Sequence, residues 1–323
     1  MTGSRRGGQD VAELVDRARR GEPRAVARLI SLVENDSPTL REVAAALAPH
    51  GGHAQVVGLT GSPGVGKSTS TSALVTALRA AGTRVGVLAV DPSSPFSGGA
   101  LLGDRVRMQD HATDDGVFIR SMASRGQLGG LSAAVPQALR VLDAAGCDVV
   151  LVETVGVGQA ELEIASLADT TLLVVAPGFG DGIQAAKAGI IEIADVFVVN
   201  KADRDGAAQL ARDLRHMQSF GGRDAPAQAW RAPIVKTVAS RGEGVADVVA
   251  AIDAHRTWLA GTGEFERRRR ARAAAEIEAI ALGTVRRTLA HVHGSAALDT
   301  AADRVAAGTT DSYTAADALL AEL

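Results

Sequence analysis

The sequence predicts an α/β fold with a doubly wound, mostly parallel sheet, preceded by a helical extension and followed by a helical arm. Three observations predict it. Apolar residues near the start recur at helical spacing, short apolar runs then alternate with amphipathic stretches, and an alanine-rich segment closes the chain. With 323 residues, 46% hydrophobic and 22% charged, the chain is long enough for one large domain with helical appendages.

The amino-terminal segment, residues 1–53, reads as a small helical extension. Its apolar residues fall at helical spacing between Asp10 and His50. Two breaks, Gly21-Glu22-Pro23 and Asp36-Ser37-Pro38, divide it, because proline can start a helix but cannot continue one. Gly51 and Gly52 form the expected linker to the next segment.

Residues 54–260 carry the pattern of a parallel sheet covered on both faces. Such a sheet needs short, continuous apolar strands separated by ten or more residues of helical pattern. The expected strands are Val56 to Thr60, Val85 to Val90, Val117 to Ile119, Val149 to Val152, Thr171 to Val175, Val196 to Val199, and Ile234 to Val235.

Residues 261–323 change composition again and predict the helical arm. After Gly261-Thr262-Gly263 an arginine run, Arg267 to Arg270, leads into an alanine-rich helix that extends to about Ala290. The arginines could form a nucleic-acid patch, but Glu264 and Glu266 precede them and more acidic residues follow. A solvated or intersubunit helix face is the favoured interpretation.

Bulk properties exclude several classes of partner. The net charge of -3 and the pI near 6.2 give no basic footprint for nucleic acid or anionic lipid, and only 3% of residues are aromatic. Cys147 is the only cysteine, which fits a reducing cytoplasm. Neither a signal peptide nor an apolar run of ~18 residues is apparent, so we expect a cytoplasmic protein.

A phosphate-binding loop lies between the first predicted strand and the helix after it. Its spacing, G-x-x-x-x-G-K-S, lets backbone N–H groups converge on phosphate oxygens at a helix amino terminus. The lysine neutralises phosphate charge and the serine hydroxyl can ligate Mg²⁺. The nucleotide-binding residues expected here are Gly61, Ser62, Pro63, Gly64, Val65, Gly66, Lys67, Ser68 and Thr69.

The base is predicted to be guanine. At the end of the strand Val196 to Val199 stands Asn200-Lys201-Ala202-Asp203, the N-K-x-D pattern of GTP-binding domains. The Asp203 carboxylate can accept hydrogen bonds from the guanine N1–H and 2-amino groups, which adenine lacks. After the last strand, Val238, Ala239 and Ser240 could present N–H groups to guanine O6, although an ordinary loop explains them as well.

Lysine usage supports both motifs. Among 34 basic residues only Lys67, Lys187, Lys201 and Lys236 are lysine, and two of them lie in the two motifs. A compact ammonium suits some sites that a planar guanidinium does not, which singles out Lys187 as a further candidate.

Carboxylates at strand ends predict a Mg²⁺ and switch site. Asp91 and Glu153 end two strands that open on the same crevice, and Asp104 lies in the loop after the first of them. With Ser68 they are the expected metal residues, and Gly156 could read the γ-phosphate. His111 is interpreted as a surface or packed histidine, and Cys147 as a small packed residue before a strand.

Taken together, these motifs resemble the MeaB/ArgK/MMAA-type GTPases of the SIMIBI class. The similar stretches, besides both motifs, are Val90 to Ser94, Gly103 to Met108, Phe118 to Met122, Arg125 to Leu131 and Val152 to Gln159. The resemblance covers roughly residues 10 to 290. It implies a GTPase that gates cobalamin loading into, and protects, a methylmalonyl-CoA mutase-type enzyme, and a carboxy-terminal arm that forms a homodimer.

The resemblance also implies an additional switch in Gly180 to Lys187, through which the partner stimulates hydrolysis, with Lys187 as a charge stabiliser. Lys67, Asp91, Asp104 and Glu153 complete the implied catalytic set. Two departures from the family pattern are Gly182, where a second acidic residue is common, and Val238, where serine is usual. The phosphate loop is untouched by either.

Three rival functions stay open. One is a kinase or ATPase linked to amino-acid transport, which the guanine motif disfavours. Another is a nickel chaperone GTPase, which needs Cys and His ligands that this chain supplies sparsely. The third is a nucleotide-dependent scaffold with negligible hydrolysis.

Overall fold

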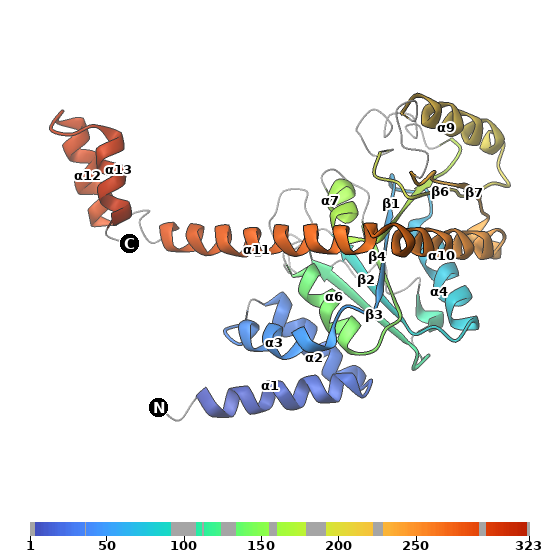
Figure 1. Cartoon of the computed structure of the whole chain (residues 1–323), viewed down its shortest axis with the longest axis horizontal. Coiled ribbons are helices and arrows are strands. Elements are labelled where there is room, and N and C mark those ends of the chain that lie inside the picture. Colours follow the sequence, from blue (N-terminus) through green and yellow to red (C-terminus); the bar gives the residue numbers. More distant parts are fainter. Residues whose placement is uncertain are drawn as a thin grey trace. The chain divides into compact units, whose positions relative to one another are not determined.

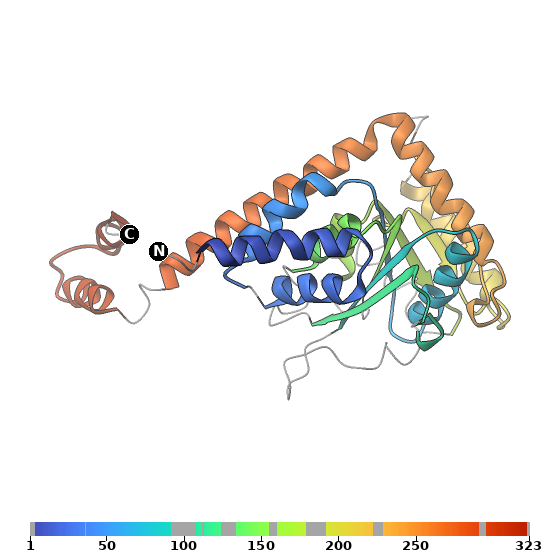
Figure 2. The same cartoon turned by 90° about the horizontal axis from the view of Figure 1, so that it is seen from below.

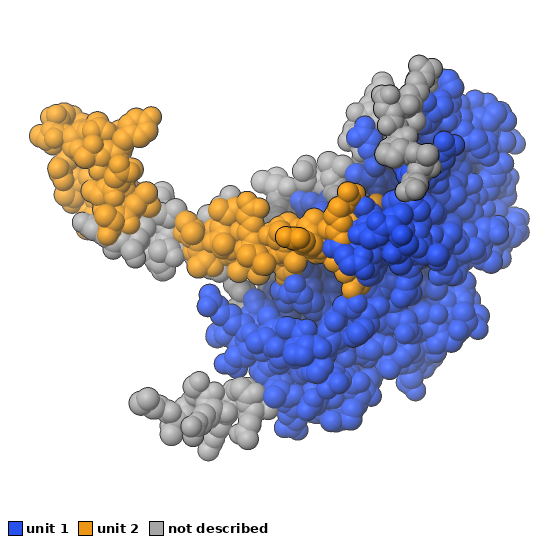
Figure 3. All heavy atoms as spheres, in the orientation of Figure 1, with its two compact units in different colours: residues 1–266 blue, residues 267–323 orange. Residues whose placement is uncertain are grey.

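The chain forms two compact units, residues 1–266 and residues 267–323 (Figure 3). The computed structural model describes residues 4–35, 37–91, 108–111, 113–123, 134–154, 160–178, 192–221, 229–290 and 295–321. Each unit is considered by itself below.

The described strands of the first unit form one seven-stranded sheet in which every pairing is parallel, in the order β3-β2-β4-β1-β5-β6-β7. This confirms the doubly wound fold predicted from the apolar runs. β3 runs four residues beyond its predicted end, because β2 continues to pair with it up to Ala123. The strands are β1 (Gln55–Thr60), β2 (Val85–Asp91), β3 (Val117–Ala123), β4 (Val149–Thr154), β5 (Thr170–Val175), β6 (Val196–Val199) and β7 (Ile234–Lys236).

Helices cover both faces of the sheet (Figure 1 and Figure 2). On one face α4 (Lys67–Ala80) and α10 (Val245–Thr262) pack on alternate strand residues such as Val57, Leu59 and Leu151. The opposite face carries α6 (Val135–Ala144), α7 (Ala160–Leu167) and, over β6 and β7, α9 (Ala207–Gly221). Burial on both sides is the physical reason why these strands read as unbroken apolar runs.

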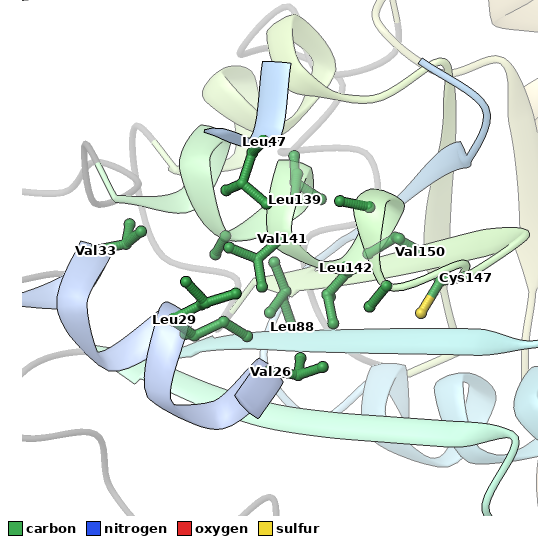
Figure 4. Packing of buried hydrophobic residues seen from close by; sticks show 14 of the residues in the cluster. Val26, Leu29, Val33, Leu47, Leu88, Leu139, Val141, Leu142, Cys147 and Val150 are labelled. Carbon is green, nitrogen blue, oxygen red and sulfur yellow. The ribbon is translucent and has the colours of Figure 1, made fainter. Parts of the chain in front are cut away.

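The amino-terminal extension packs on the sheet domain as a second helical layer. It consists of α1 (Ser4–Arg19), α2 (Pro23–Glu34), α3 (Leu40–Leu47) and the short 3₁₀ helix η1 (Ala48–His50). Figure 4 shows Val26, Leu29 and Val33 of α2 in the same apolar cluster as Leu139 and Leu142 of α6. Burial of these side chains fixes the extension to the domain.

Two polar contacts hold the extension in place. Arg120 Nη2 of β3 donates to Glu34 Oε2 of α2 at 2.6 Å and to Ser31 Oγ at 3.1 Å. The linker is held by Asp143 of α6, whose carboxylate accepts the backbone N–H groups of residues 52–54. One carboxylate thus satisfies three consecutive amides that have left the helical pattern.

A buried polar cluster lies at the amino edge of the sheet. His255 of α10 is fully buried, with Nδ1 2.9 Å from Thr170 Oγ1 and Nε2 3.2 Å from Asp195 Oδ1. Its ring stacks on Trp258 at 5.7 Å between centroids and lies 4.7 Å from the ring of Trp230. The cluster joins α10 to the starts of β5 and β6.

The second unit is helical in its described part. It contains most of α11 (Glu264–Ala290), then α12 (Ala296–Ala306), capped by the Ser295 hydroxyl, and α13 (Ser312–Ala321). α11 agrees with the predicted end near Ala290. Its exposed apolar residues include Ile277, Ile280 and Val285. None of the helices in the described part of the chain combines the length and apolar character that spanning a membrane requires.

Candidate nucleotide-binding site

The phosphate loop connects the end of β1 directly to α4, which begins at Lys67. Gly61, Gly64 and Gly66 have positive φ values of 139°, 81° and 97°. A Cβ at Gly61 would collide with the carbonyl oxygen of Val174, and one at Gly66 with the side-chain nitrogen of Asn200. Two of the loop glycines are therefore required both by backbone conformation and by the close approach of neighbouring strands.

Lys67 folds back inside this loop. Its ammonium donates hydrogen bonds to the carbonyl oxygen of Gly61 at 2.6 Å and to that of Ser62 at 3.2 Å. The residue is only 7% exposed, so the charge sits next to the amino terminus of α4 with little contact with water. Positive charge beside the amino terminus of a helix makes an anion site.

Glu153 lies behind Ser68 and is buried. Its Oε1 accepts the Ser68 hydroxyl at 2.6 Å, and its Oε2 lies 3.0 Å from Thr71 Oγ1 one turn further along α4. The carboxylate accepts the Ser68 proton and thereby orients the hydroxyl oxygen beside the phosphate loop. β4 continues one residue past Glu153, to Thr154, so this carboxylate projects from within the strand.

Asn200 ties the base-reading loops to the phosphate loop. Its side-chain N–H donates to the carbonyl oxygen of Val65 at 2.9 Å. Its Oδ1 accepts the Ala239 N–H at 3.1 Å and the Thr237 hydroxyl at 3.2 Å. The buried amide therefore sets the distance between three segments, a role that the sequence motif alone does not reveal.

Lys201 adopts a left-handed backbone conformation, with φ of 55°, and its ammonium donates to the carbonyl oxygen of Gly64 at 2.7 Å. Burial lowers the pKa of Lys201 below its usual value, and the nearby Arg204 charge lowers it further. The side chain thereby stretches from the guanine motif to the phosphate loop.

Asp203, the residue predicted to bind guanine, is exposed and pairs with Arg241. Arg241 Nη2 lies 3.5 Å from its Oδ2. Two of the three amides predicted to face guanine O6 are used within the protein: Val238 N–H donates to the Glu243 carbonyl and Ala239 N–H to Asn200. The assignment of residues 238–240 to the base stays a prediction.

Several predicted residues fall outside the described part of the chain. Asp91 ends β2, as expected, but only its backbone is described. Asp104, Gly156 and the segment Gly180 to Lys187 lie outside the described residues. Their expected roles at the metal and switch sites stay predictions.

The two residues interpreted as packed have contacts consistent with that reading. His111 Nε2 lies 3.2 Å from Ser72 Oγ of α4. Cys147 is buried beside Val150 and Leu142 (Figure 4), and burial raises its pKa to about 12. A thiol with so high a pKa is a poor nucleophile at neutral pH.

Three residues of the site were not predicted from the sequence: Thr71, Thr237 and Arg241. Thr71 could have been found by its position, because it lies one helical turn after Lys67 and therefore on the same side of α4. Thr237 and Arg241 carry no such signal, since only the folded loops bring them to Asn200 and Asp203.

Comparison with known proteins gives a consistent result. Residues 26–293 match the family described as "Methylmalonyl Co-A mutase-associated GTPase MeaB". A Pyrococcus abyssi protein named as a GTPase is 46% identical over 313 residues, which cover 97% of this chain and 97% of that protein. The GTPase ArgK of Escherichia coli is 37% identical over 262 residues, covering 79% of each chain.

Two further similarities bear on function. The Mus musculus protein "Methylmalonic aciduria type A homolog, mitochondrial" is 36% identical over 214 residues, which cover 66% of this chain and 52% of that protein. The crystal structure of a LAO/AO transport system kinase superposes with a TM-score of 0.68 at 28% identity, covering 96% of both chains.

Proposed function

Because the chain belongs to the family of methylmalonyl Co-A mutase-associated GTPases, MeaB, and is therefore a GTP hydrolase, we propose that its GTP cycle serves as a chaperone for a cobalamin-dependent mutase. In this proposal the cycle gates cofactor loading into the partner and protects it during turnover. The family match over residues 26–293 is the observation that carries the proposal. The name of the Mus musculus relative points in the same direction.

The described residues support a division of labour in GTP binding. Lys67 would leave the Gly61 and Ser62 carbonyls and pair with the β- and γ-phosphates, while the N–H groups of the loop hold the other phosphate oxygens. Asp203 would exchange Arg241 for the guanine N1–H and 2-amino groups. Asn200 keeps both loops at the required spacing.

The donor set fits Mg²⁺. The buried Glu153 carboxylate accepts the Ser68 hydroxyl proton and orients the hydroxyl oxygen, and hard oxygen donors of this kind are what Mg²⁺ accepts together with nucleotide phosphates. When bound, the ion neutralises negative charge that builds up on the phosphates. We assign Ser68 as the ligand, Glu153 as the group that orients it, and Asp91 and Asp104 as the further acidic residues of the site.

Regulation is proposed to run through the loops after Asp91, Glu153 and Gly180. Intrinsic turnover is expected to be slow, since a charge-stabilising group contributed on partner binding can accelerate phosphoryl transfer by about 10³ to 10⁵. Lys187 is the proposed group, and Gly156 the proposed reader of the γ-phosphate. The proposal also divides the chain into a helical extension (residues 1–53), a GTPase domain (residues 54–260) and an arm (residues 261–323) that forms a homodimer. It places the protein in the cytoplasm.

The proposal is tested by capture from the native lysate with the protein locked in a GDP or a non-hydrolysable GTP-analogue state, followed by GTPase assays with the recovered protein. A cobalamin-dependent acyl-CoA mutase, recovered in a nucleotide-dependent manner and accelerating GTP hydrolysis, is the expected result. Recovery of nothing nucleotide-dependent, or of a metalloenzyme without cobalamin, would overturn the chaperone role and leave the GTPase intact.

The role of Lys187 needs a matched lysine control. Lys187→Ala is expected to retain GDP affinity and basal hydrolysis but to lose at least about tenfold of the partner-stimulated rate. Lys236→Ala removes an exposed lysine of β7 and is expected to keep the full stimulation. Equal stimulation of both variants would remove Lys187 from the mechanism, and a scaffold with negligible hydrolysis would respond to neither change.

A kinase is the second candidate, because a structure that covers 96% of this chain is named as a transport system kinase. The two candidates differ in where the γ-phosphoryl group goes. With GTP labelled in the γ-phosphate, a hydrolase releases all the label as inorganic phosphate. Label on the partner protein would instead establish phosphoryl transfer to protein.

A further inference from the structure

We propose that the first unit carries a second ligand site, on the edge of the sheet opposite the nucleotide loops, which binds a small phosphorylated molecule. The site is a hollow of about 540 Å³. Four separate segments line it: the end of α1, the linker region before β1, the turn between α6 and β4, and α10. The lining includes Arg19, His50, His53, Asp143, Asp148 and Arg256.

The position of the hollow follows from the parallel sheet. Asp148 directly precedes β4 and His53 lies just before β1, so the hollow is at the amino ends of these strands. The phosphate loop leaves the carboxyl end of β1, six residues away. A strand of that length spans about 20 Å. The two sites are therefore separate, and a ligand of one does not occupy the other.

The volume matches a small molecule. Ligand pockets in proteins commonly enclose about 300–1,000 Å³. A bare phosphate ion would fill only part of the hollow, so the shape has room for the organic group that the phosphate is attached to. The polar side chains around it indicate that this group is itself hydrophilic.

The two carboxylates in the hollow already serve the backbone. The Asp143 carboxylate accepts the backbone N–H groups of residues 52–54. Its Oδ1 lies 3.1 Å from His53 N and 2.9 Å from Ala54 N. Asp148 Oδ2 accepts the Arg84 N–H at 2.7 Å. These contacts build the walls of the hollow and partly compensate both negative charges.

Two of the side chains that face the hollow are cationic. Arg19 and Arg256 are exposed guanidinium groups, and the rings of His50 and His53 lie on the same lining. Among the described residues, Arg19 pairs with Asp16, which is itself exposed, at 3.6 Å. Guanidinium forks match the geometry of phosphate oxygens and bind them in pairs of hydrogen bonds. A phosphate ester is thus the chemistry that this set of side chains recognises.

Metal binding and covalent chemistry explain the hollow less well. Within the described residues, no three His, Cys, Asp or Glu side chains come together in a way that could hold a metal ion. Cys147 also lines the hollow, but burial raises the pKa of its thiol to about 12. At neutral pH it stays protonated and serves neither as a soft ligand nor as a nucleophile.

The test uses the full chain saturated with Mg²⁺ and a non-hydrolysable GTP analogue, so that every phosphate position of the phosphate loop is filled. Inorganic phosphate is the probe, added at constant pH and constant ionic strength against chloride, and the imidazole signals of the seven histidines are followed by NMR. Saturable shifts of His50 and His53, with His216 of α9 unmoved, are expected. Shifts that do not saturate, or that appear equally at His216, would overturn the proposal.

Arginine variants make the test specific. Arg256→Gln and Arg19→Gln are each expected to weaken phosphate binding about tenfold, because each removes a charged pair of donors. Arg212→Gln on α9 removes an exposed arginine outside the hollow and is the matched control. Unchanged GDP affinity verifies that each variant is folded. Retention of full phosphate affinity in both hollow variants would refute the site, whatever becomes of the mutase-chaperone role.

Discussion

At the residue scale, we expect the base specificity of the protein to depend on one surface carboxylate, Asp203. Asp203 accepts both guanine donors in the proposed complex, and hydrogen bonds to a charged group contribute about 1.5–3 kcal/mol each. Asp203→Asn is therefore expected to weaken GDP binding by about ten- to a hundredfold per bond lost. The same change should favour XDP, because the new amide N–H can donate to the xanthine 2-oxo group.

Isothermal titration of both nucleotides checks this expectation. Asp205→Asn changes a second exposed aspartate two positions further on and is the matched control, with no change of preference expected. A variant at Asp203 that still prefers GDP with undiminished affinity would mean that another group reads the base.

The single cysteine offers an independent probe of residue burial. Burial raises the pKa of Cys147 to about 12, from the 9.0 of a free thiol. At pH 8 the thiolate fraction is then about 10³ lower than in the unfolded chain, and a thiol reagent should react slower by at least that factor. A Cys147 that reacts in native protein as fast as in denatured protein would contradict the structure.

The same shift has a consequence for stability. Folding raises the pKa of the Cys147 thiol from 9.0 to about 12. Below pH 9 the thiol is neutral in both the folded and the unfolded chain. Between pH 9 and 12 only the unfolded chain loses the proton, so the free energy of unfolding falls as pH rises through this range. The single thiol is thus a factor in alkaline unfolding only.

At the element scale, the contact between the amino-terminal helices and the sheet can be tested through one ion pair. Arg120 of β3 and Glu34 of α2 are mostly buried, with side-chain exposures of 24% and 11%. Glu34→Gln removes the charge that faces Arg120 and is expected to lower the free energy of unfolding by about 1–3 kcal/mol. Urea-induced unfolding of the native protein and the variant measures this difference in the free energy of unfolding.

The control for this change is an ion pair within the extension itself. Arg17 and Glu22 lie 2.8 Å apart with both side chains 40% exposed, and Glu22→Gln is expected to have little effect on unfolding. If both variants were equally stable, α2 would be held by its apolar face alone.

The aromatic cluster tests how α10 is fastened to the sheet. His255 lies between Asp195, Thr170 and the only two tryptophans of the chain. His255→Leu leaves Thr170 and Asp195 without the imidazole and is expected to cost about 1–3 kcal/mol of unfolding free energy. Tryptophan fluorescence reports the loss locally, and an unchanged emission spectrum and midpoint would show that the ring is dispensable.

At the scale of the whole molecule, we expect the division into two units to separate nucleotide binding from the proposed assembly. Every described residue of the nucleotide site belongs to residues 1–266, whereas α11 presents exposed apolar side chains such as Ile277 and Ile280, which are 69% and 55% exposed. In the proposed homodimer this surface is covered. Ile277→Arg with Ile280→Arg is expected to give a monomer with unchanged GDP affinity.

Light scattering after gel filtration checks the mass, and nucleotide titration checks the site. A single exposed residue elsewhere is changed in Arg212→Gln, which serves as the control for altered surface charge. A double variant that keeps the oligomeric state of the native protein would exclude this face of α11 from the dimer.

The sequence by itself determined the parallel sheet, the phosphate loop and the guanine motif. Each is written in local pattern: unbroken apolar runs where strands are covered on both faces, and glycine, lysine and hydroxyl residues at fixed spacing between a strand and a helix. For that reason the ends of β2, β6 and α11 could be predicted to the residue or nearly so.

Only the tertiary structure decided how these pieces contact one another. Asn200 reaches Val65 across 135 positions of sequence and Asp143 holds residues 52–54 across about ninety, and no local pattern encodes such pairs. Glu153 meets Ser68 and Thr71 only when α4 packs on the sheet. The hollow between α1, α6 and α10 likewise forms only when these helices pack. Side-chain chemistry is local, but the distances that turn it into a site come from packing between strands and helices far apart in the chain.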